Sequence, residues 1–181
     1  METNRPERLF HVSDQPDIPS FAPRPARPGH PNDPGRPVVW AIAERLLHNY
    51  LLPRDCPRVT FHARPDSDPA DVARLMGQTA ARYVVAVESG RLAAIRAAVL
   101  YLYEFPTEGF ELFDEGAGYY VRSSAVTPRA VRRVDDLLGE LAARDVELRV
   151  TPSLWPLHDA VAASTLQFSC IRMRNARSDK T

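Results

Sequence analysis

The distribution of proline constrains the fold more than any other feature of this sequence. Nine of the 17 prolines fall in the first 38 residues, most of them in PRPARPGHPNDPGRP, residues 23–37. Proline lacks a backbone N–H and cannot occupy a helix interior, so we expect an extended surface loop at 23–37. A long loop of this kind is typical either of plain or disordered surface chain or of a functional lid.

Beyond this loop, short apolar runs alternate with helical spacings. Strands are predicted around Phe10 and at residues 37–43, 58–64, 82–88, 99–105, 110–113, 118–122 and 146–150. Short helices are predicted at residues 44–51, 68–77, 89–98 and 135–145, the second with Asp68 as its N-cap. We therefore expect an α+β fold. It would be one domain over residues 1–181, a mixed, mostly antiparallel sheet with short helices and a frayed tail at about 176–181.

The C-terminal region, residues 153–176, has helical spacing. The residues that fall on one helical face are Leu157, Val161, Ser164, Phe168 and Ile171. Arg172 and Arg174 would then lie near the carboxyl end of a helix, where positive charge is favourable. We therefore predict a helix over this region.

Charge and hydropathy narrow the classes of partner. The 23 basic residues, of which only Lys180 is lysine, balance 23 acidic ones, so there is no strong nucleic-acid signal and no attraction to anionic membranes. The sequence lacks a run of ~18 apolar residues and an apolar secretory signal. Cys56 and Cys170 are too few for a disulfide framework and have no zinc spacing. We expect a cytoplasmic protein without a structural metal.

The first concentration of polar residues is LFHVSDQPDIPSFAPRP, residues 9–25. His11 lies between Phe10 and Val12 on the expected opening strand, so its ring projects to the opposite face. An imidazole with an ordinary pKa of about 6.5 can donate, accept or transfer a proton. Ser13 could extend such a site or simply start a turn. A binding role for His11 and a plain strand-end histidine both fit the pattern.

The second concentration is NYLLPRDCPRVTF, residues 49–61, where two prolines bracket a stiff turn. Arg54 or Arg58 could hold a carboxylate or phosphate through two N–H groups. Alternatively, Asp55 pairs with one of these arginines and fixes the loop. Cys56 could act as a nucleophile if the arginines lowered its pKa and a histidine served as base, but an inert thiol also fits.

An acidic run surrounds the expected hairpin of residues 110–122. It consists of Glu104, Glu108, Glu111, Asp114 and Glu115. Runs of this kind are usually solvated edges that discourage pairing with another sheet. We expect these carboxylates to lie in solvent.

Several segments resemble a bacterial family of unknown function. Its members share an opening Phe-His-x-Ser segment, here Phe10 to Ser13, and a Pro-Arg-Asp-Cys-Pro-Arg loop, here residues 53–58. The segments YEFP, GYYVR, AVTP and FSCIRMRNA are also similar, so the resemblance covers most of the chain. It implies a coherent single domain and carries no activity.

Residues 9–13 also resemble the opening strand of some ADP-ribosyltransferases, which reads Leu-Tyr-His followed by a small hydroxyl residue. In that superfamily the histidine holds the NAD ribose, a later aromatic residue flanks the nicotinamide, and a glutamate near a late strand assists transfer. The resemblance implies that His11 holds the ribose and that Tyr50, or else Trp40, is the aromatic residue. GYYVRSS presents tyrosines where the glutamate is wanted, and Glu115 lies four residues earlier.

Three functional hypotheses follow. The leading one is a small ADP-ribosyltransferase-like domain that binds a nucleotide such as NAD, or another small anionic ligand. Its cleft would be lined by His11, Ser13, Arg24, Tyr50, Arg54 and Arg58. The second is a non-catalytic interaction module that docks its proline-rich segment onto a protein partner. The third is a cysteine-dependent enzyme.

Overall fold

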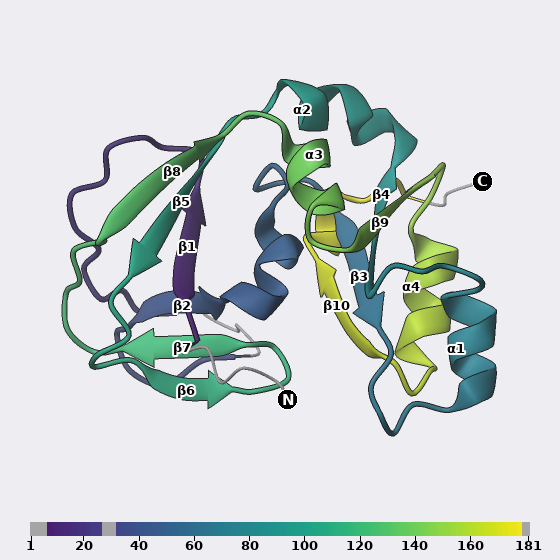
Figure 1. Cartoon of the computed structure of the whole chain (residues 1–181), viewed down its shortest axis with the longest axis horizontal. Coiled ribbons are helices and arrows are strands. Elements are labelled where there is room, and N and C mark those ends of the chain that lie inside the picture. Colours follow the sequence, from purple (N-terminus) through teal and green to yellow (C-terminus); the bar gives the residue numbers. More distant parts are fainter. Residues whose placement is uncertain (1–6, 27–31, 179–181) are drawn as a thin grey trace. The chain divides into compact units, whose positions relative to one another are not determined.

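The computed structural model describes residues 7–26 and 32–178 (Figure 1). The chain divides into two compact units, the first built from Met1–Leu47 and Leu100–Val134, the second from His48–Val99 and Asp135–Thr181. Each unit has its own β-sheet, so the predicted α+β class is confirmed, with the strands divided over two sheets. The prediction that residues 1–181 make one domain stays a prediction.

The first unit contains a six-stranded antiparallel sheet with the order β6-β7-β2-β1-β5-β8. The strands are β1 Leu9–Ser13, β2 Val39–Ala43, β5 Leu100–Phe105, β6 Glu111–Asp114, β7 Tyr119–Arg122 and β8 Ala130–Val134. The predicted hairpin at 110–122 is confirmed as β6 and β7. Strand β8 was not predicted, because AVRRV has neither a continuous apolar run nor clean alternation.

The core of the first unit lies on one face of this sheet. Its buried residues are Leu9, Val39, Ala41, Tyr103, Phe105 and Val126. Leu9 lies opposite Phe105 in the β1–β5 pairing, and directly opposed residues of an antiparallel pair point to the same face. The segment between β1 and β2 contributes Phe21, whose ring meets those of Tyr103 and Phe105 edge-on at 5.1 and 5.0 Å. Part of the segment between β1 and β2 therefore covers the core face.

The second unit contains a four-stranded sheet with the order β10-β3-β4-β9. The strands are β3 Arg58–His62, β4 Tyr83–Glu88, β9 Val146–Thr151 and β10 Gln167–Ile171. The helices are α1 Pro69–Leu75, α2 Leu92–Ala97, α3 Leu137–Ala142 and α4 Trp155–Ala162, with 3-10 turns η2 Ser89–Arg91 and η3 Met173–Asn175. A further 3-10 segment, η1 Glu44–Tyr50, contains the boundary between the two units after Leu47. Strands β4 and β9 run parallel, and the other pairs are antiparallel.

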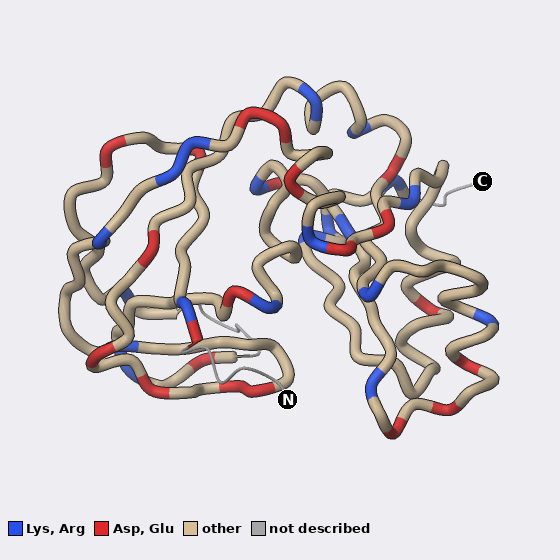
Figure 2. Tube along the Cα trace, in the orientation of Figure 1, with Lys and Arg blue, Asp and Glu red and all other residues tan. Residues whose placement is uncertain are grey.

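Charged residues are interspersed along the described trace of both units (Figure 2), as the balanced composition suggests. None of the helices in the described ranges has the length and apolar character that crossing a membrane requires. Across residues 7–26 and 32–178, no group of three or more His, Cys, Asp or Glu side chains is arranged to hold a metal ion.

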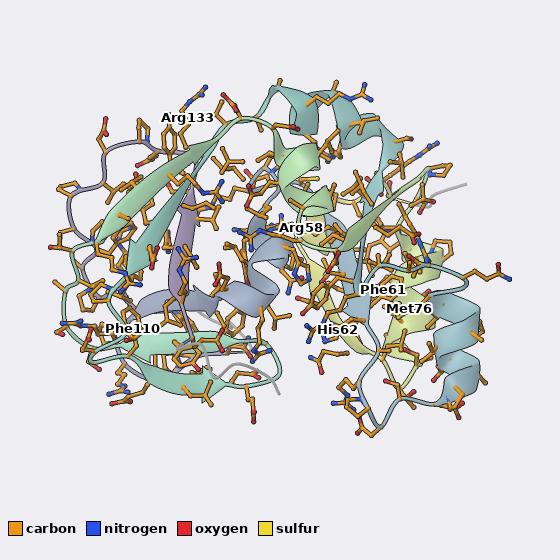
Figure 3. All side chains as sticks on the ribbon, viewed as in Figure 1. Arg58, Phe61, His62, Met76, Phe110 and Arg133 are labelled. Carbon is orange, nitrogen blue, oxygen red and sulfur yellow. The ribbon has the colours of Figure 1, made fainter. Side chains whose placement is uncertain are left out.

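The core of the second unit lies between its sheet and helices α1 and α4. Val59 and Phe61 from β3 pack with Val84 and Ala86 from β4, and Leu75 and Met76 from the α1 end join them. Figure 3 shows Phe61 and Met76 on the helix side of β3. Helix α1 begins as predicted, since the Asp68 carboxylate accepts a hydrogen bond from the Ala70 N–H at 2.7 Å.

The predicted helix over residues 153–176 is wrong beyond Ala162. Helix α4 ends there, and β10 pairs antiparallel with β3, placing Phe168 opposite Phe61. The Ser164 hydroxyl donates to the Val161 carbonyl at 2.7 Å, and such local bonds compete with helix continuation. Arg172 is therefore not at a helix end; it has a left-handed backbone with φ 57°.

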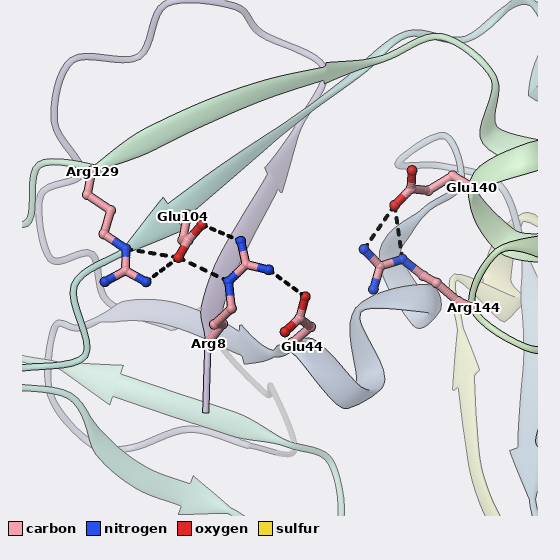
Figure 4. Close-up of polar contacts among 6 residues, drawn as sticks. All are labelled: Arg8, Glu44, Glu104, Arg129, Glu140 and Arg144. Atoms are coloured by element: carbon pink, nitrogen blue, oxygen red, sulfur yellow. Dashed lines mark hydrogen bonds and ion pairs between the residues drawn. The ribbon is translucent and has the colours of Figure 1, made fainter. Parts of the chain in front are cut away.

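The expectation that the acidic run lies in solvent is wrong for Glu104, which is 9% exposed. Its carboxylate accepts hydrogen bonds from Arg8 on one side and from Arg129 on the other (Figure 4). Arg8 also donates to Glu44 at 2.7 Å. The hydrogen bonds from Arg8 and then those from Arg129 lower the pKa of Glu104 from 4.5 to about 2. Glu104 is thus the centre of a charged network in the first unit.

Candidate functional site

His11 lies in β1 with its side chain on the core face of the first unit. It is paired with Tyr103 in β5, and its half-buried ring lies 4.8 Å from that of Phe21 and 6.3 Å from that of Phe105. The expectation that His11 projects away from Phe10 agrees with this register. The imidazole is therefore positioned by aromatic neighbours.

The Tyr103 hydroxyl and a backbone bridge fix the segment that carries Phe21. The hydroxyl donates to the Gln15 carbonyl at 2.6 Å and accepts from the Ile18 N–H at 3.1 Å. Phe21 and Val126 exchange two backbone hydrogen bonds of 2.9 and 3.0 Å. The Phe21 ring is consequently held beside His11 by contacts at both ends of a short segment.

Ser13 and Arg24 flank this segment in the first unit. The Ser13 hydroxyl accepts from the Gln15 N–H at 3.1 Å, which is the turn that the sequence left as an alternative. Arg24 exchanges two backbone hydrogen bonds of 3.0 Å with Val38, and its side chain is exposed. The first unit thus contains three of the predicted site residues.

The other three, Tyr50, Arg54 and Arg58, belong to the second unit. Arg58 is 2% exposed and lies 5.9 Å from the Tyr50 ring centre. It donates to the carbonyls of Asn49, Pro53 and Cys56 at 3.1, 3.3 and 2.8 Å. These contacts tie the turn together from inside.

Arg54 lies on the outside of the same turn, with an exposed side chain. Its backbone carbonyl accepts from Arg172 Nε at 3.2 Å, and the same nitrogen lies 3.9 Å from the Asp55 carboxylate. Asp55 was expected to pair with Arg54 or Arg58, whereas the ion pair that the structure gives it is with Arg172, from the C-terminal region.

Cys56 is buried in this turn. Burial raises the pKa of its thiol, Arg58 and Arg91 oppose that effect, and Glu88 adds to it. Burial likewise raises the pKa of Cys170 to about 11. A nucleophilic cysteine needs a lowered pKa, so these environments do not favour the cysteine-dependent enzyme.

A row of rings in the second unit was not identified from the sequence as a group. The Tyr83 ring lies 4.1 Å from that of His48 and 5.1 Å from that of His62. Nearby in the chain, the buried Asn49 side-chain oxygen accepts no hydrogen bond from the described residues.

The sequence RVTFH, residues 58–62, indicates that one face of this sheet carries polar side chains. Alternate residues of a strand point to one face, so Arg58, Thr60 and His62 share the side opposite Phe61. Figure 3 shows Arg58 and His62 away from the helix side of β3. The alternation of polar residues could have identified this face, whereas the contribution of Tyr83 depends on strand pairing.

Comparison with known proteins identifies a family and no activity. No curated protein and no solved structure matches the chain. The model described as a family of unknown function (DUF6886) matches residues 10–176, a range that includes Phe10–Ser13 and the turn at 53–58. The predicted membership of an uncharacterised family is confirmed, while the likeness to ADP-ribosyltransferases stays a prediction. The chain therefore belongs to the family of unknown function DUF6886.

Proposed function

We propose that this is a cytoplasmic protein that binds a small anionic ligand, with a nucleotide such as NAD as the leading class, around His11 in the first unit. The observation that carries the proposal is the half-buried imidazole of His11, held 4.8 Å from the Phe21 ring. The exposed Arg24 guanidinium belongs to the same segment. The proposal concerns binding, whether or not a reaction follows.

His11, Phe21 and Ser13 supply the contacts that a nucleoside requires. A planar base or nicotinamide ring stacks favourably on aromatic side chains, and the imidazole can exchange hydrogen bonds with ribose hydroxyls. The Ser13 oxygen already accepts from Gln15, which leaves its O–H to donate. Ligand sites commonly combine apolar rings with a few fixed polar groups of this kind.

Arg24 supplies the positive charge for a phosphate. A guanidinium can donate two parallel N–H groups to phosphate oxygens. The two backbone hydrogen bonds to Val38 fix the position from which this side chain extends. Arg58 is omitted from the site, because its N–H groups contact three carbonyls of its own turn.

Calorimetric titration with NAD tests the proposal. We expect binding in the range of ~1 mM or tighter for the intact protein, and at least a roughly tenfold weaker affinity for His11→Ala, about 1.4 kcal/mol. The reason is the loss of both the ring surface and the ribose partner. His158→Ala, which removes a histidine from α4 in the second unit, is the matched control and should bind normally.

The charge contribution is separated by comparing adenosine with ADP. Arg24→Ala should weaken ADP and leave adenosine unchanged, because only ADP carries the phosphates. Absence of heat at millimolar NAD and ADP, or equal weakening by the His11 and His158 substitutions, contradicts the proposal.

A second candidate is protein recognition through the proline-rich segment. The Arg24–Val38 bridge closes the base of this loop and favours its presentation as a unit, although residues 27–31 lie outside the described residues. Deleting residues 25–34 should leave the midpoint of thermal unfolding unchanged, because a short loop can still close the bridge. Co-purification of a protein partner should be lost, which pull-down with the deletion variant measures. Retained co-purification contradicts this candidate.

A further inference from the structure

The segment that follows β10 lies against the turn that contains Cys56. Arg172 Nε donates to the Arg54 carbonyl at 3.2 Å, and Asn175 Nδ2 donates to the Asp55 carbonyl at 2.9 Å. Both acceptors directly precede Cys56, which is 4% exposed. The segment is therefore attached to the chain beside this thiol.

Side chains of the second unit also bind the main chain of this segment. The Glu88 carboxylate accepts from the Arg177 N–H, at 2.9 Å to Oε1 and 3.1 Å to Oε2. Arg91 donates to the Asn175 carbonyl at 2.7 Å, and the Trp155 indole N–H donates to the Arg177 carbonyl at 3.0 Å. An acceptor and two donors thus hold backbone groups of Asn175 and Arg177, at the end of the 3-10 turn η3.

Glu88 lies where the fold is suited to bind a ligand. It is the last residue of β4, which forms with β9 the one parallel pair among the described strands of this four-stranded sheet, and in parallel arrangements ligands bind outside the carboxyl ends of strands. Glu88 is 5% exposed, and a buried carboxylate is costly without hydrogen-bond donors. The Arg177 N–H meets this requirement with a backbone group that any polypeptide residue except proline has.

We propose that the carboxyl end of β4 is a binding site for a polypeptide segment that consists of one 3-10 turn and the two residues after it. Residues 173–177 occupy it as an intramolecular ligand and lie against the turn that contains the buried Cys56 thiol. The site uses Glu88, Arg91 and Trp155 and is independent of the ligand site proposed around His11. Because these side-chain contacts reach backbone atoms, a separate peptide with the same backbone groups can replace the segment.

The test compares Arg177→Pro with Arg177→Ala in the full chain. Both remove the same side chain, but only proline removes the N–H that Glu88 accepts. The preceding residue, Ala176, has φ −68° and ψ 151°, a conformation compatible with a following proline. Iodoacetamide labelling of Cys56, resolved by peptide mass spectrometry, measures whether the segment has left the turn that contains this thiol.

We expect Cys56 to be labelled at least about tenfold faster in Arg177→Pro than in Arg177→Ala, because a tenfold change in rate corresponds to the loss of one modest hydrogen bond. The labelling rate of Arg177→Ala should match that of the wild type. Cys170 packs against the helix-side core and reports general opening. A synthetic peptide of residues 172–178, RMRNARS, should restore slow labelling to the proline variant. The same peptide with proline for Arg177 should not.

Three results would overturn the proposal. The first is equal Cys56 labelling in the proline and alanine variants. The second is an equal acceleration of Cys170, which would show general unfolding. The third is failure of the RMRNARS peptide to slow Cys56 labelling, which would show that the segment is a fixed part of the fold and not a replaceable ligand.

Discussion

Arg58→Ala should lower the free energy of unfolding by about 3 to 5 kcal/mol. Arg58 is 2% exposed and donates to the carbonyls of Asn49, Pro53 and Cys56, so alanine leaves a cavity and buried acceptors without donors. Urea denaturation followed by circular dichroism measures the change. Arg58→Lys should recover only part of the loss, because a compact ammonium cannot reproduce the fork of a guanidinium.

Arg54→Ala is the matched control for this prediction. Arg54 lies in the same turn with an exposed side chain, so its truncation should change the free energy of unfolding by no more than about 0.5 kcal/mol. Similar losses for the two alanine variants would contradict the assignment of Arg58 as the internal support of the turn.

Local sequence patterns were sufficient to predict strand β4 and helix α1. Strand β4 was recognisable because YVVAVE is β-branched and almost uninterrupted, and every residue of it is buried. Helix α1 was recognisable because Asp68 and Pro69 supply a cap and a preorganised first position. In both cases the local preference and the tertiary environment agree.

The prediction of one helix over the C-terminal region was wrong because its apolar residues fit both the period of a helix and that of a strand. Phe168 continues the helical face of Val161, and it also lies opposite Phe61 when β10 pairs with β3. Pairing with a strand more than a hundred residues earlier is set by the sheet, which helical spacing cannot reveal. Strand β8 was missed for the same reason. Its arginines are exposed at the edge of the sheet, so its sequence shows no apolar period.

The candidate site shows a similar division between local and long-range information. His11 could be proposed from its position between Phe10 and Val12, but the ring beside it comes from Phe21 and is held by a bridge to Val126. Arg58 was proposed as a ligand contact, whereas the structure directs it to carbonyls of its own turn. Sequence alone shows which functional group a side chain carries, but not which residue that group contacts in the fold.

At neutral pH, Glu104→Gln should remove most of a contribution of about 3 kcal/mol to the free energy of unfolding. This is the free energy that corresponds to lowering the pKa of Glu104 from 4.5 to about 2 on folding. Arg8 and Arg129 donate to the carboxylate, and glutamine keeps its shape without the charge. Arg8 and Glu104 are 96 positions apart, so the contacts exist only in the folded chain. The contribution therefore belongs to the folded state.

The pH dependence identifies this contribution by its sign. The folded-state pKa of Glu104 is depressed, so the stabilisation is present above pH 4.5 and is lost as the pH falls toward about 2. Urea unfolding at several pH values should show a constant gap between wild type and Glu104→Gln above pH ~5, narrowing below it. Glu111→Gln is the control: its side chain is 71% exposed and pairs with Arg36, so its effect should stay below about 1 kcal/mol at every pH. A gap that does not narrow on acidification would mean that Glu104 stabilises the sheet by shape and not by its charge.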